Sequence, residues 1–415
     1  MQSMFGRRLA VNEVFTPRRT DVNRDVYVER PDLEKELRRA LAGSLHTIIF
    51  GESGCGKSWL YKKVIADLDA YSLSANCANA LRFGSLTAEI KQVIALEAPK
   101  RLTEVSEEKS AGISAVIAEG GLTSTRNYEF AELDPLLECF RFMRDAAGRR
   151  LSVLVIDNLE MIFKSEALMS ELASIVTLLD DKRYAQYEVK LLIVGVPSGV
   201  KEYFLGTHAS VANRVAEMSE VSSLTEQQVA ALVKKGFVGL LKVDLDDETL
   251  EVWQRHVARV TMGFAQHVQE YCEQLGYVVE DAGWVGSNAQ LVQADGHWLK
   301  RGLSEASVLI ASWMNERETK IGRRNQVLYV LGKMEKRVFS INEVESMLRS
   351  EFPKSTADTT LAVGQMLGEL ANGGKPIIKR SAKGSSYEFK DARFAMALRV
   401  LLQKDPTRET ITKME

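Results

Sequence analysis

The sequence predicts an α/β protein in which a parallel sheet covered by helices is followed by a helical domain and a small third domain. Three observations lead to this prediction. Short apolar, β-branched segments alternate with helical patterns as far as Val221, which is the order of βα units that build a parallel sheet. From Ser223 onward the patterns are helical, and between 321 and 400 three helical segments precede two short strands.

The first domain is predicted to span residues 26–222, after an N-terminal segment at 1–25. Its opening helix at 32–42 carries leucines on one face and charges on the other. We expect its strands at 45–50, 70–75, 151–157, 189–195 and 215–221. The stretch near 100–130 interrupts the alternation around Gly120-Gly121, and we interpret it as an inserted hairpin.

The remaining chain divides into a helical lid at 223–300, a connecting helix at 301–320, a third domain at 321–400 and a tail at 401–415. In the third domain we expect helices at 325–334, 341–350 and 357–371. A β-hairpin turning at Lys383-Gly384 follows them. Three helices closed by a two-stranded wing are the pattern of a winged helix.

Composition narrows the class of protein. Of 415 residues, 45% are apolar and 27% charged, which is typical of a folded chain without extensive disorder. The four cysteines form no C-x-x-C pair, so neither a zinc site nor a disulfide framework is indicated. No secretory h-region and no run of 18 apolar residues occurs, so we expect a cytoplasmic protein without a membrane span.

The segment GESGCGKS at 51–58 carries the strongest chemical signal. It matches G-x-x-x-x-G-K-[ST] and lies between a predicted strand and a predicted helix, which is the setting of a phosphate-binding loop, or P-loop. Glycines let consecutive backbone N–H groups face a phosphate at the positive end of the helix. Lys57 is expected to neutralise the β- and γ-phosphates and Ser58 to bind Mg²⁺. The predicted nucleotide contacts in this segment are Gly51, Glu52, Ser53, Gly54, Cys55, Gly56, Lys57, Ser58 and Trp59.

The segment LSVLVIDNLE at 151–160 supplies the partner carboxylate. Asp157 ends an apolar strand at the edge where Mg²⁺ has to be held, so Ser58 and Asp157 are the predicted metal ligands. Many ATPases of this kind place a glutamate directly after that aspartate to orient the attacking water, but Asn158 stands here and the next acid is Glu160. Two alternatives stay open: Glu160 reaches the water, or hydrolysis is slow and the protein works as a nucleotide switch. The chain has neither an LSGGQ-like ABC signature nor the N-K-x-D motif that reads guanine, which favours adenine as the base.

Taken together, GESGCGKS, VLVIDNLE, VKLLIVGVPS and the N-terminal VFTPRRTDVNRDVYVERPDLEKEL resemble the AAA+ superfamily, in the branch of archaeal origin-recognition initiators and STAND-like ATPases. The resemblance implies that Arg30 packs beside the adenine pocket and that Ser198 acts as sensor 1. Arg214 stands where such families often keep an arginine before the fifth strand. It is either an arginine finger directed at a neighbouring subunit's γ-phosphate or a surface arginine.

One family feature is missing. Initiator-type lids commonly carry a sensor 2 arginine after a glycine, whereas TMGFAQHVQEY at 261–271 offers Gln266 and His267. This departure moves the resemblance toward the STAND-like relatives.

Charge is segregated along the chain. Residues 320–415 contain 18 Lys and Arg against 11 Asp and Glu, although the whole chain has a net charge of −2. The predicted contacts to double-stranded DNA are the wing residues Lys375, Lys379, Arg380 and Lys383. The helix predicted at 357–371 would enter the major groove with Thr359, Thr360 and Gln365.

The sequence therefore predicts an ATPase that uses ATP and Mg²⁺ and whose nucleotide state controls homo-oligomerisation and engagement of DNA. Lys57, Asp157, Asn158, Glu160, Ser198 and Arg214 are its predicted catalytic residues. Two alternatives remain: a STAND-like signalling or antiphage-defence switch that acts on a protein effector, and a transposon target-selection ATPase.

Overall fold

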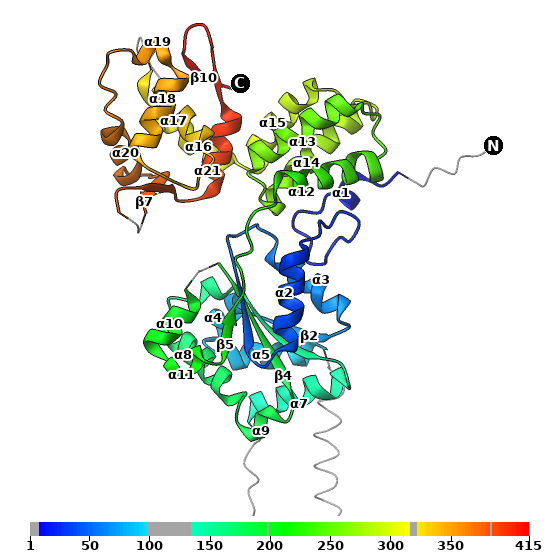
Figure 1. The fold of residues 1–415 in the computed structure, drawn as a ribbon. Coiled ribbons are helices and arrows are strands. Elements are labelled where there is room, and N and C mark those ends of the chain that lie inside the picture. Colours follow the sequence, from blue (N-terminus) through cyan, green and yellow to red (C-terminus); the bar gives the residue numbers. More distant parts are fainter. Residues whose placement is uncertain (1–7, 98–133, 197–198, 316–321, 382–383, 415) are drawn as a thin grey trace, which may run out of the picture. The chain divides into compact units, whose positions relative to one another are not determined.

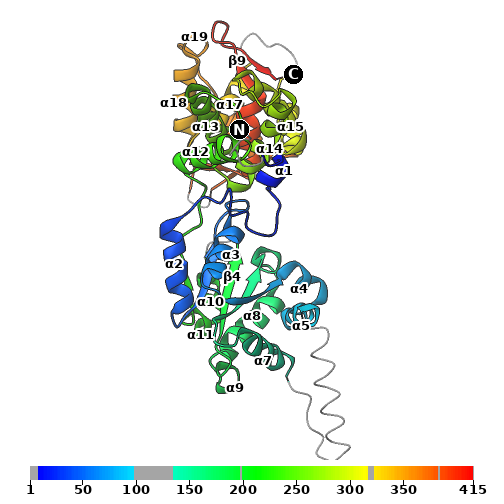
Figure 2. The same ribbon diagram turned by 90° about the vertical axis from the view of Figure 1, so that its right-hand side faces the viewer.

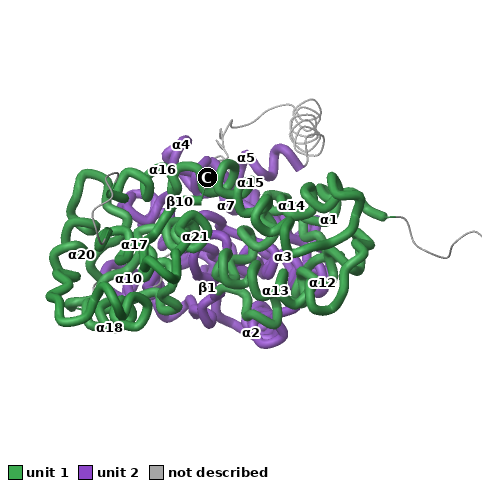
Figure 3. Tube along the Cα trace, turned by 90° about the horizontal axis from the view of Figure 1, so that it is seen from above, with its two compact units in different colours: residues 1–28, 223–415 green, residues 29–222 purple. Residues whose placement is uncertain are grey.

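The computed structural model describes residues 8–97, 134–196, 199–315, 322–381 and 384–414. It divides into two compact units, which Figure 3 draws in different colours. Unit 2 is the continuous stretch Glu29–Ser222, whereas unit 1 combines Met1–Val28 with Ser223–Glu415. The hairpin predicted near 100–130 lies outside the described residues.

Unit 2 is built around a parallel sheet of five strands in the order β2-β3-β4-β1-β5, as far as the described residues go. The strands are β1 (His46–Phe50), β2 (Tyr71–Asn76), β3 (Ser152–Asp157), β4 (Val189–Gly195) and β5 (Val215–Glu217). The predicted parallel sheet is thus confirmed, and β5 is shorter than predicted. Beyond Glu217 the chain still follows β1, because the N–H groups of Met218 and Val221 donate to the carbonyls of Ile48 and Phe50.

Helices cover both faces of this sheet. One face packs its alternate strand residues, such as Ile48, Leu154 and Ile193, into a core shared with several helices. Those helices are α4 (Cys77–Phe83), α5 (Leu86–Glu97), α7 (Pro135–Ala147), α8 (Glu166–Leu178), α10 (Val200–Thr207) and α11 (Ala209–Ala212), with α9 (Lys182–Ala185) beside α7. Figure 2 shows α2 (Pro31–Ala42) on the opposite side of the sheet from α4 and α5. Helix α3 (Lys57–Asp67) packs against α2.

The strand order fixes which loops meet at the carboxyl edge of the sheet. Strand β4 lies between β1 and β3, with Gly195 opposite Phe50 and Ile193 opposite Ile156. Parallel strands end at the same edge, so the segments that follow β1, β4 and β3 lie in that order along it. The edge therefore gathers the loop after Phe50, the chain after Gly195 and the carboxylate that ends β3.

In unit 1, the residues from Ser223 to Trp313 form a helical region, drawn in green to yellow in Figure 1. It consists of α12 (Glu226–Lys234), a π-helical turn at Lys235–Leu240, α13 (Asp247–Thr261), α14 (Ala265–Asp281), α15 (Ala289–Arg301) and α16 (Ser304–Trp313). Helix α16, from Ser304 to Trp313, lies within the stretch 301–320 for which a connecting helix was predicted. Met262 and Gly263 take positive φ between α13 and α14, and a Cβ on Gly263 would lie 2.2 Å from the carbonyl oxygen of Leu224.

The N-terminal segment packs into this helical region. Helix α1 (Val11–Val14) buries Val11 and Val14, and Phe15 stacks against Phe237 at 5.1 Å between ring centroids. Glycines at 236 and 276 leave the space that Phe15 and Val11 occupy, since a Cβ at either position would come within 2.7 Å of those side chains. Residues 8–28 are thus an integral part of unit 1.

Between residues 323 and 389, the described chain contains three longer helices, one short helix and a three-stranded antiparallel sheet. The helices are α17 (Arg323–Lys333), α18 (Ile341–Glu351) and α20 (Val363–Asn372), with the short α19 (Pro353–Thr356) after α18. The strands are β6 (Val338–Phe339), β7 (Ile378–Arg380) and β8 (Tyr387–Phe389), in the order β6-β8-β7. The helix predicted to begin at 357 begins only at Val363, because Asp358 and Ala362 adopt positive φ.

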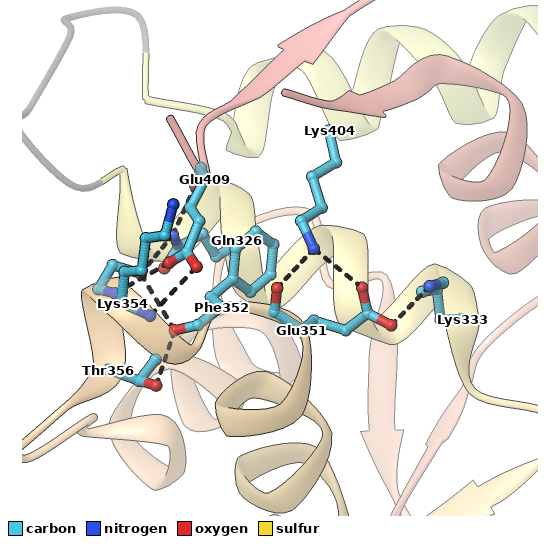
Figure 4. A network of polar contacts seen from close by, with 9 residues as sticks. Gln326, Lys333, Glu351, Phe352, Lys354, Thr356, Lys404 and Glu409 are labelled. Atoms are coloured by element: carbon cyan, nitrogen blue, oxygen red, sulfur yellow. Dashed lines mark hydrogen bonds and ion pairs between the residues drawn. The ribbon is translucent and has the colours of Figure 1, made fainter. Parts of the chain in front are cut away.

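The last described residues form α21 (Ala392–Leu401) and a hairpin of β9 (Leu402–Lys404) and β10 (Ile411–Lys413). Figure 4 shows how this hairpin is held. The carboxylate of Glu409 accepts hydrogen bonds from the backbone N–H groups of Lys354 and Ser355, and its carbonyl accepts one from Gln326. Nearby, the Lys404 ammonium donates to Glu351, which also pairs with Lys333. The residues predicted as a tail are therefore bound to α17, α18 and α19.

Among the described residues, no helix is both long enough and apolar enough to span a membrane.

Candidate nucleotide site

The loop after β1 has a backbone that only glycine adopts easily. Gly51, Gly54 and Gly56 have φ values of 151°, 81° and 91°, within the range that disfavours residues with a Cβ. A Cβ on Gly51 would also lie 2.4 Å from the carbonyl oxygen of Val221. Helix α3 begins directly after Gly56, so the loop ends at the positive end of a helix of 11 residues.

Lys57 folds back over this loop. Its ammonium donates to the carbonyl oxygens of Gly51 and Glu52, each at 2.8 Å. Burial lowers the pKa of Lys57, and the negative charges of Glu160 and Asp157 act in the opposite direction. The Lys57 ammonium is therefore close enough to the two carboxylates predicted for the site to interact with their charges.

Asp157 ends β3, and both of its carboxylate oxygens accept a hydrogen bond. The N–H of Asn158 donates to Oδ1 at 2.9 Å, and the hydroxyl of Tyr61 donates to Oδ2 at 3.0 Å. Tyr61 lies on α3, one helical turn after Ser58, and is buried. Burial, and next the charge of Asp157, raises the pKa of Tyr61 well above its usual value, which keeps the hydroxyl protonated as a donor.

The two candidates for orienting water differ in how they are held. Asn158 adopts the left-handed conformation, φ 60° and ψ 45°, which asparagine tolerates better than most residues. Glu160 is exposed in the following turn at Leu159–Met161, and its carboxylate accepts a hydrogen bond from the N–H of Val196 at 3.2 Å. Glu160 is thus linked to the chain that leaves β4.

Arg30 connects the entry of α2 to the loop. It is 8% exposed, and its guanidinium donates to the carbonyl oxygen of Cys55 at 2.7 Å and to that of Ser222 at 2.9 Å. Cys55 itself is buried, and burial followed by the charge of Glu52 raises the pKa of its thiol to about 11. At neutral pH this cysteine is therefore an uncharged thiol.

Arg214 lies directly before β5, at the opposite end of the strands from the loop. Its backbone carbonyl accepts a hydrogen bond from the N–H of His46, the first residue of β1. Its guanidinium pairs with Asp180 at 2.5 Å. This position separates Arg214 from the loop of its own chain by the length of β1. Ser198, the predicted sensor 1, lies outside the described residues.

In the predicted sensor 2 region, Gln266 and His267 both contact the carboxylate of Glu270. Gln266 donates to Glu270 Oε1 at 2.9 Å, and His267 Nδ1 lies 2.8 Å from Glu270 Oε2. Both side chains are therefore engaged within α14.

Among the described residues, the predicted DNA contacts of the wing lie on β7 and shortly before it. Arg380 is exposed at the end of β7, whereas Lys379 already pairs with Glu388 at 3.0 Å, and Lys375 precedes the strand. Lys383 lies outside the described residues. On α20 the exposed polar side chains are Gln365 and Asn372, while Thr359 and Thr360 precede the helix.

Sequence reasoning identified the loop and Asp157, but it missed Tyr61 and the carbonyl contacts of Arg30. Tyr61 follows Lys57 on the same helix, as many core residues do, and no motif marks it. Its contact with Asp157 depends on tertiary packing between α3 and β3, 96 positions apart in the sequence.

The residues present fit a magnesium–nucleotide complex by their chemistry. The glycine backbone and the start of α3 offer N–H groups to a phosphate chain, and Lys57 adds a positive charge. Ser58 and Asp157 provide a hydroxyl and a carboxylate, the hard oxygen donors that Mg²⁺ prefers.

Comparisons with known proteins agree with this architecture. A family model described as an AAA domain matches residues 40–204. No curated protein matches the chain. Among solved structures, a Walker-type ATPase of Pyrococcus abyssi is similar with a TM-score of 0.51 and 16% identity, covering 92% of this chain and 99% of that chain.

Two further structures match with TM-scores below 0.5. The Orc1 protein of Aeropyrum pernix in complex with DNA has a TM-score of 0.47 and 17% identity, covering 94% of this chain and 96% of its own. The Orc2 protein of Aeropyrum pernix, in ADPNP–ADP complexes, has a TM-score of 0.46 and 11% identity, covering 89% of this chain and 92% of its own. The comparisons thus identify residues 40–204 as similar to an AAA domain, in a chain that shares the fold of a Walker-type ATPase.

Proposed function

We propose that the chain binds ATP together with Mg²⁺ at the carboxyl edge of the unit 2 sheet and hydrolyses ATP to ADP and phosphate. One observation carries the proposal: Lys57 and Asp157 lie at the same edge of one parallel sheet, beside a loop in which Gly51, Gly54 and Gly56 take positive φ. The match of residues 40–204 to an AAA domain supports it.

In this proposal the chain's own residues act mainly by position and charge. N–H groups of the loop bind the phosphates, and Lys57 leaves the carbonyls of Gly51 and Glu52 to lie along them. Ser58 and Asp157 hold Mg²⁺, which supplies neutralisation of the phosphate charge. Asn158 or Glu160 orients the attacking water, and the contact of Glu160 with Val196 couples it to the segment that contains Ser198, the proposed sensor 1.

Homo-oligomerisation is part of the proposal because of where Arg214 lies. At the amino end of β5 it is a full strand length from the loop of its own chain, so as an arginine finger it acts on a neighbouring copy. Its ion pair with Asp180 has to open for this role.

The test is nucleotide binding by calorimetry and turnover by phosphate release. Lys57→Ala is expected to abolish ATP binding or turnover, because the variant lacks the ammonium that lies over the loop. Asp157→Asn is expected to retain nucleotide but lose magnesium-dependent turnover. Lys91→Ala, an exposed lysine on α5, is the matched control and is expected to behave as wild type. Unchanged ATP affinity and turnover in Lys57→Ala would refute the proposal.

We further propose that the C-terminal region is a winged helix that engages double-stranded DNA under control of the nucleotide. The order α17, β6, α18, α20, β7 and β8 is that of three helices and a wing, and residues 320–415 carry 18 basic against 11 acidic residues. Contacts to phosphates through Lys375 and Arg380 carry most of the binding in this proposal, and Lys379 and Lys383 are further proposed contacts.

A switch that acts on a protein effector is the second candidate function. A specific observation favours it: the polar face of α20 presents Glu369, paired with Arg324 at 2.5 Å, and no basic residue. A helix with this surface is poorly suited to enter the major groove of DNA.

A further inference from the structure

We infer that Arg30 is a positioning residue for the phosphate loop, acting through the carbonyl of Cys55, and that it does not act through the adenine base. This inference rests on the proposed function and states which contact orients the loop for binding phosphate. The family resemblance suggested a place beside adenine for this arginine, whereas in the structure two of its guanidinium nitrogens donate to main-chain oxygens.

The first step is the direction of one peptide group. Arg30 Nη2 donates to the carbonyl oxygen of Cys55 at 2.7 Å. The described chain has no cis peptide, so the C=O of Cys55 and the N–H of Gly56 point in opposite directions in one plane. Holding the carbonyl toward Arg30 therefore turns the Gly56 N–H to the other side of the peptide, away from the guanidinium.

The second step is what that N–H does. Gly56 directly precedes α3, and its φ of 91° is the turn that lets the loop curl into the helix. In a phosphate loop, N–H groups at this position face the anion at the positive end of the helix. A charge-assisted hydrogen bond on the neighbouring carbonyl keeps this donor oriented before any ligand arrives.

The third step is how Arg30 is itself held in place. The guanidinium is buried, and a second nitrogen, Nη1, donates to the carbonyl of Ser222 at 2.9 Å. Its backbone N–H donates to Glu34, which packs in the first turn of α2. On the other side of the loop, the carbonyl of Val221 is in close contact with Gly51. Both ends of the loop are thus held against residues 221–222. Gly51 lies against Val221 at the first end, and Arg30 links Cys55 to Ser222 at the second.

Polyphosphate without a base separates this role from a contact with adenine. We would measure the affinity of the full chain for MgATP and for magnesium tripolyphosphate by calorimetry, in wild type, Arg30→Ala and Arg30→Lys. If Arg30 orients the loop, Arg30→Ala lowers the affinity for both ligands by the same factor, about tenfold, because both ligands accept a hydrogen bond from the Gly56 N–H. Loss of ATP affinity with unchanged tripolyphosphate affinity would instead identify a contact with the base and overturn the inference.

Arg30→Lys separates orientation from plain charge. A lysine keeps the positive charge, but its ammonium replaces the planar fork that reaches two carbonyls at once. We expect Arg30→Lys to lose nearly as much affinity as Arg30→Ala, and to do so equally at low and high salt. Wild-type affinity in Arg30→Lys would show that only the charge matters and would also overturn the inference.

The controls address folding. Arg150→Ala removes an arginine that likewise donates to two backbone carbonyls, those of Ala146 and Ala147, and is expected to leave both affinities unchanged. If Arg30→Ala unfolds, Arg30→Lys carries the test. Turnover gives a further measurement: KM for ATP rises about tenfold while kcat at saturation stays within about twofold, as expected for a contact that serves binding. A wild-type protein that binds neither ligand would refute the proposed function as a whole, whereas the behaviour of the Arg30 variants tests only the role of Arg30.

Discussion

The Asp157 side chain shows how a single buried hydroxyl sets the geometry of a carboxylate. Tyr61 occupies one lone pair of Oδ2 and the backbone N–H of Asn158 one of Oδ1. Each carboxylate oxygen has a second lone pair that remains for a metal ion or its water. The tyrosine thereby orients the proposed magnesium ligand without competing for it.

Removing the Tyr61 hydroxyl is expected to raise the Mg²⁺ concentration that ATP turnover requires. In Tyr61→Phe, Asp157 keeps its charge but loses one hydrogen bond. A hydrogen bond to a charged group is worth about 1.5 kcal/mol, which corresponds to roughly a tenfold higher magnesium requirement for turnover. The measurement is ATPase rate against Mg²⁺ concentration at saturating ATP.

Tyr184→Phe is the matched control, because the hydroxyl of Tyr184 donates to Asp134 in the same unit, away from the loop. We expect this variant to show the wild-type magnesium requirement. An equal magnesium requirement in Tyr61→Phe and wild type would mean that Asp157 does not depend on the tyrosine.

At the scale of elements, the parallel sheet was predictable because its strands are short, apolar and separated by helical patterns. The loop and Asp157 followed from the sequence as well, since a motif and a strand end mark them. The bounds of α20 did not, because apolar spacing extends back to Leu361 while the backbone at Asp358 and Ala362 breaks the helix. Contacts such as Tyr61 to Asp157 and Arg30 to Cys55 depend on packing between distant segments, which spacing along the chain cannot reveal.

The hairpin β9–β10 depends on one side chain for its attachment to α19. Glu409 has a positive φ, 55°, and its carboxylate caps the N–H groups of Lys354 and Ser355. Burial disfavours the charged form of Glu409, but hydrogen bonds from the backbone of Ser355 and Lys354 outweigh it, and the pKa of Glu409 is lowered.

Glu409→Ala is therefore expected to destabilise unit 1 by about 1 kcal/mol at neutral pH, as loss of a helix cap does. A lowered pKa in the folded state means that this stabilisation is present above the unfolded glutamate pKa, about 4.3, and is lost as pH falls through the folded value. Thermal unfolding of wild type and variant at pH 7 and at acidic pH measures the difference.

The pH dependence distinguishes the cap from simple loss of packing. The gap between the two melting temperatures should narrow at acidic pH, whereas a gap that stays constant would contradict the role of the charge. Glu251→Ala, an exposed glutamate on α13, is the control and is expected to melt as wild type.

At the scale of the whole molecule, charge is divided between regions that are far apart in the sequence. A net charge of −2 conceals a surplus of basic residues after position 320. Several of these are neutralised locally, by Glu343, Glu351 and Asp391 among others, so only part of the surplus is available to a partner.

Double-stranded DNA is expected to bind in the presence of ATP and to dissociate with rising salt. The double variant Lys375→Ala/Arg380→Ala should lower the affinity and reduce the slope of log K against log salt by about two, one for each side chain that no longer neutralises a phosphate. Fluorescence anisotropy of a labelled duplex at two or more salt concentrations measures both quantities.

Lys35→Ala/Arg39→Ala, which removes two exposed basic residues from α2, is the control for net charge and is expected to keep the wild-type slope. No binding of duplex by a folded protein with ATP would favour the switch that acts on a protein effector.

The way in which the chain divides between its units affects how it is made on the ribosome. Unit 2 is one continuous stretch, whereas residues 8–28 belong to a unit whose other part begins at Ser223. At about 5 to 20 residues per second, synthesis from Ser223 to Asp281, the end of α14, takes roughly 3 to 12 s. During this time the sheet and the phosphate loop can fold, while Val11, Val14 and Phe15 still wait for the helices that will bury them. Nascent unit 2 is thus complete before unit 1, and an apolar N-terminal segment is exposed to chaperones throughout that interval.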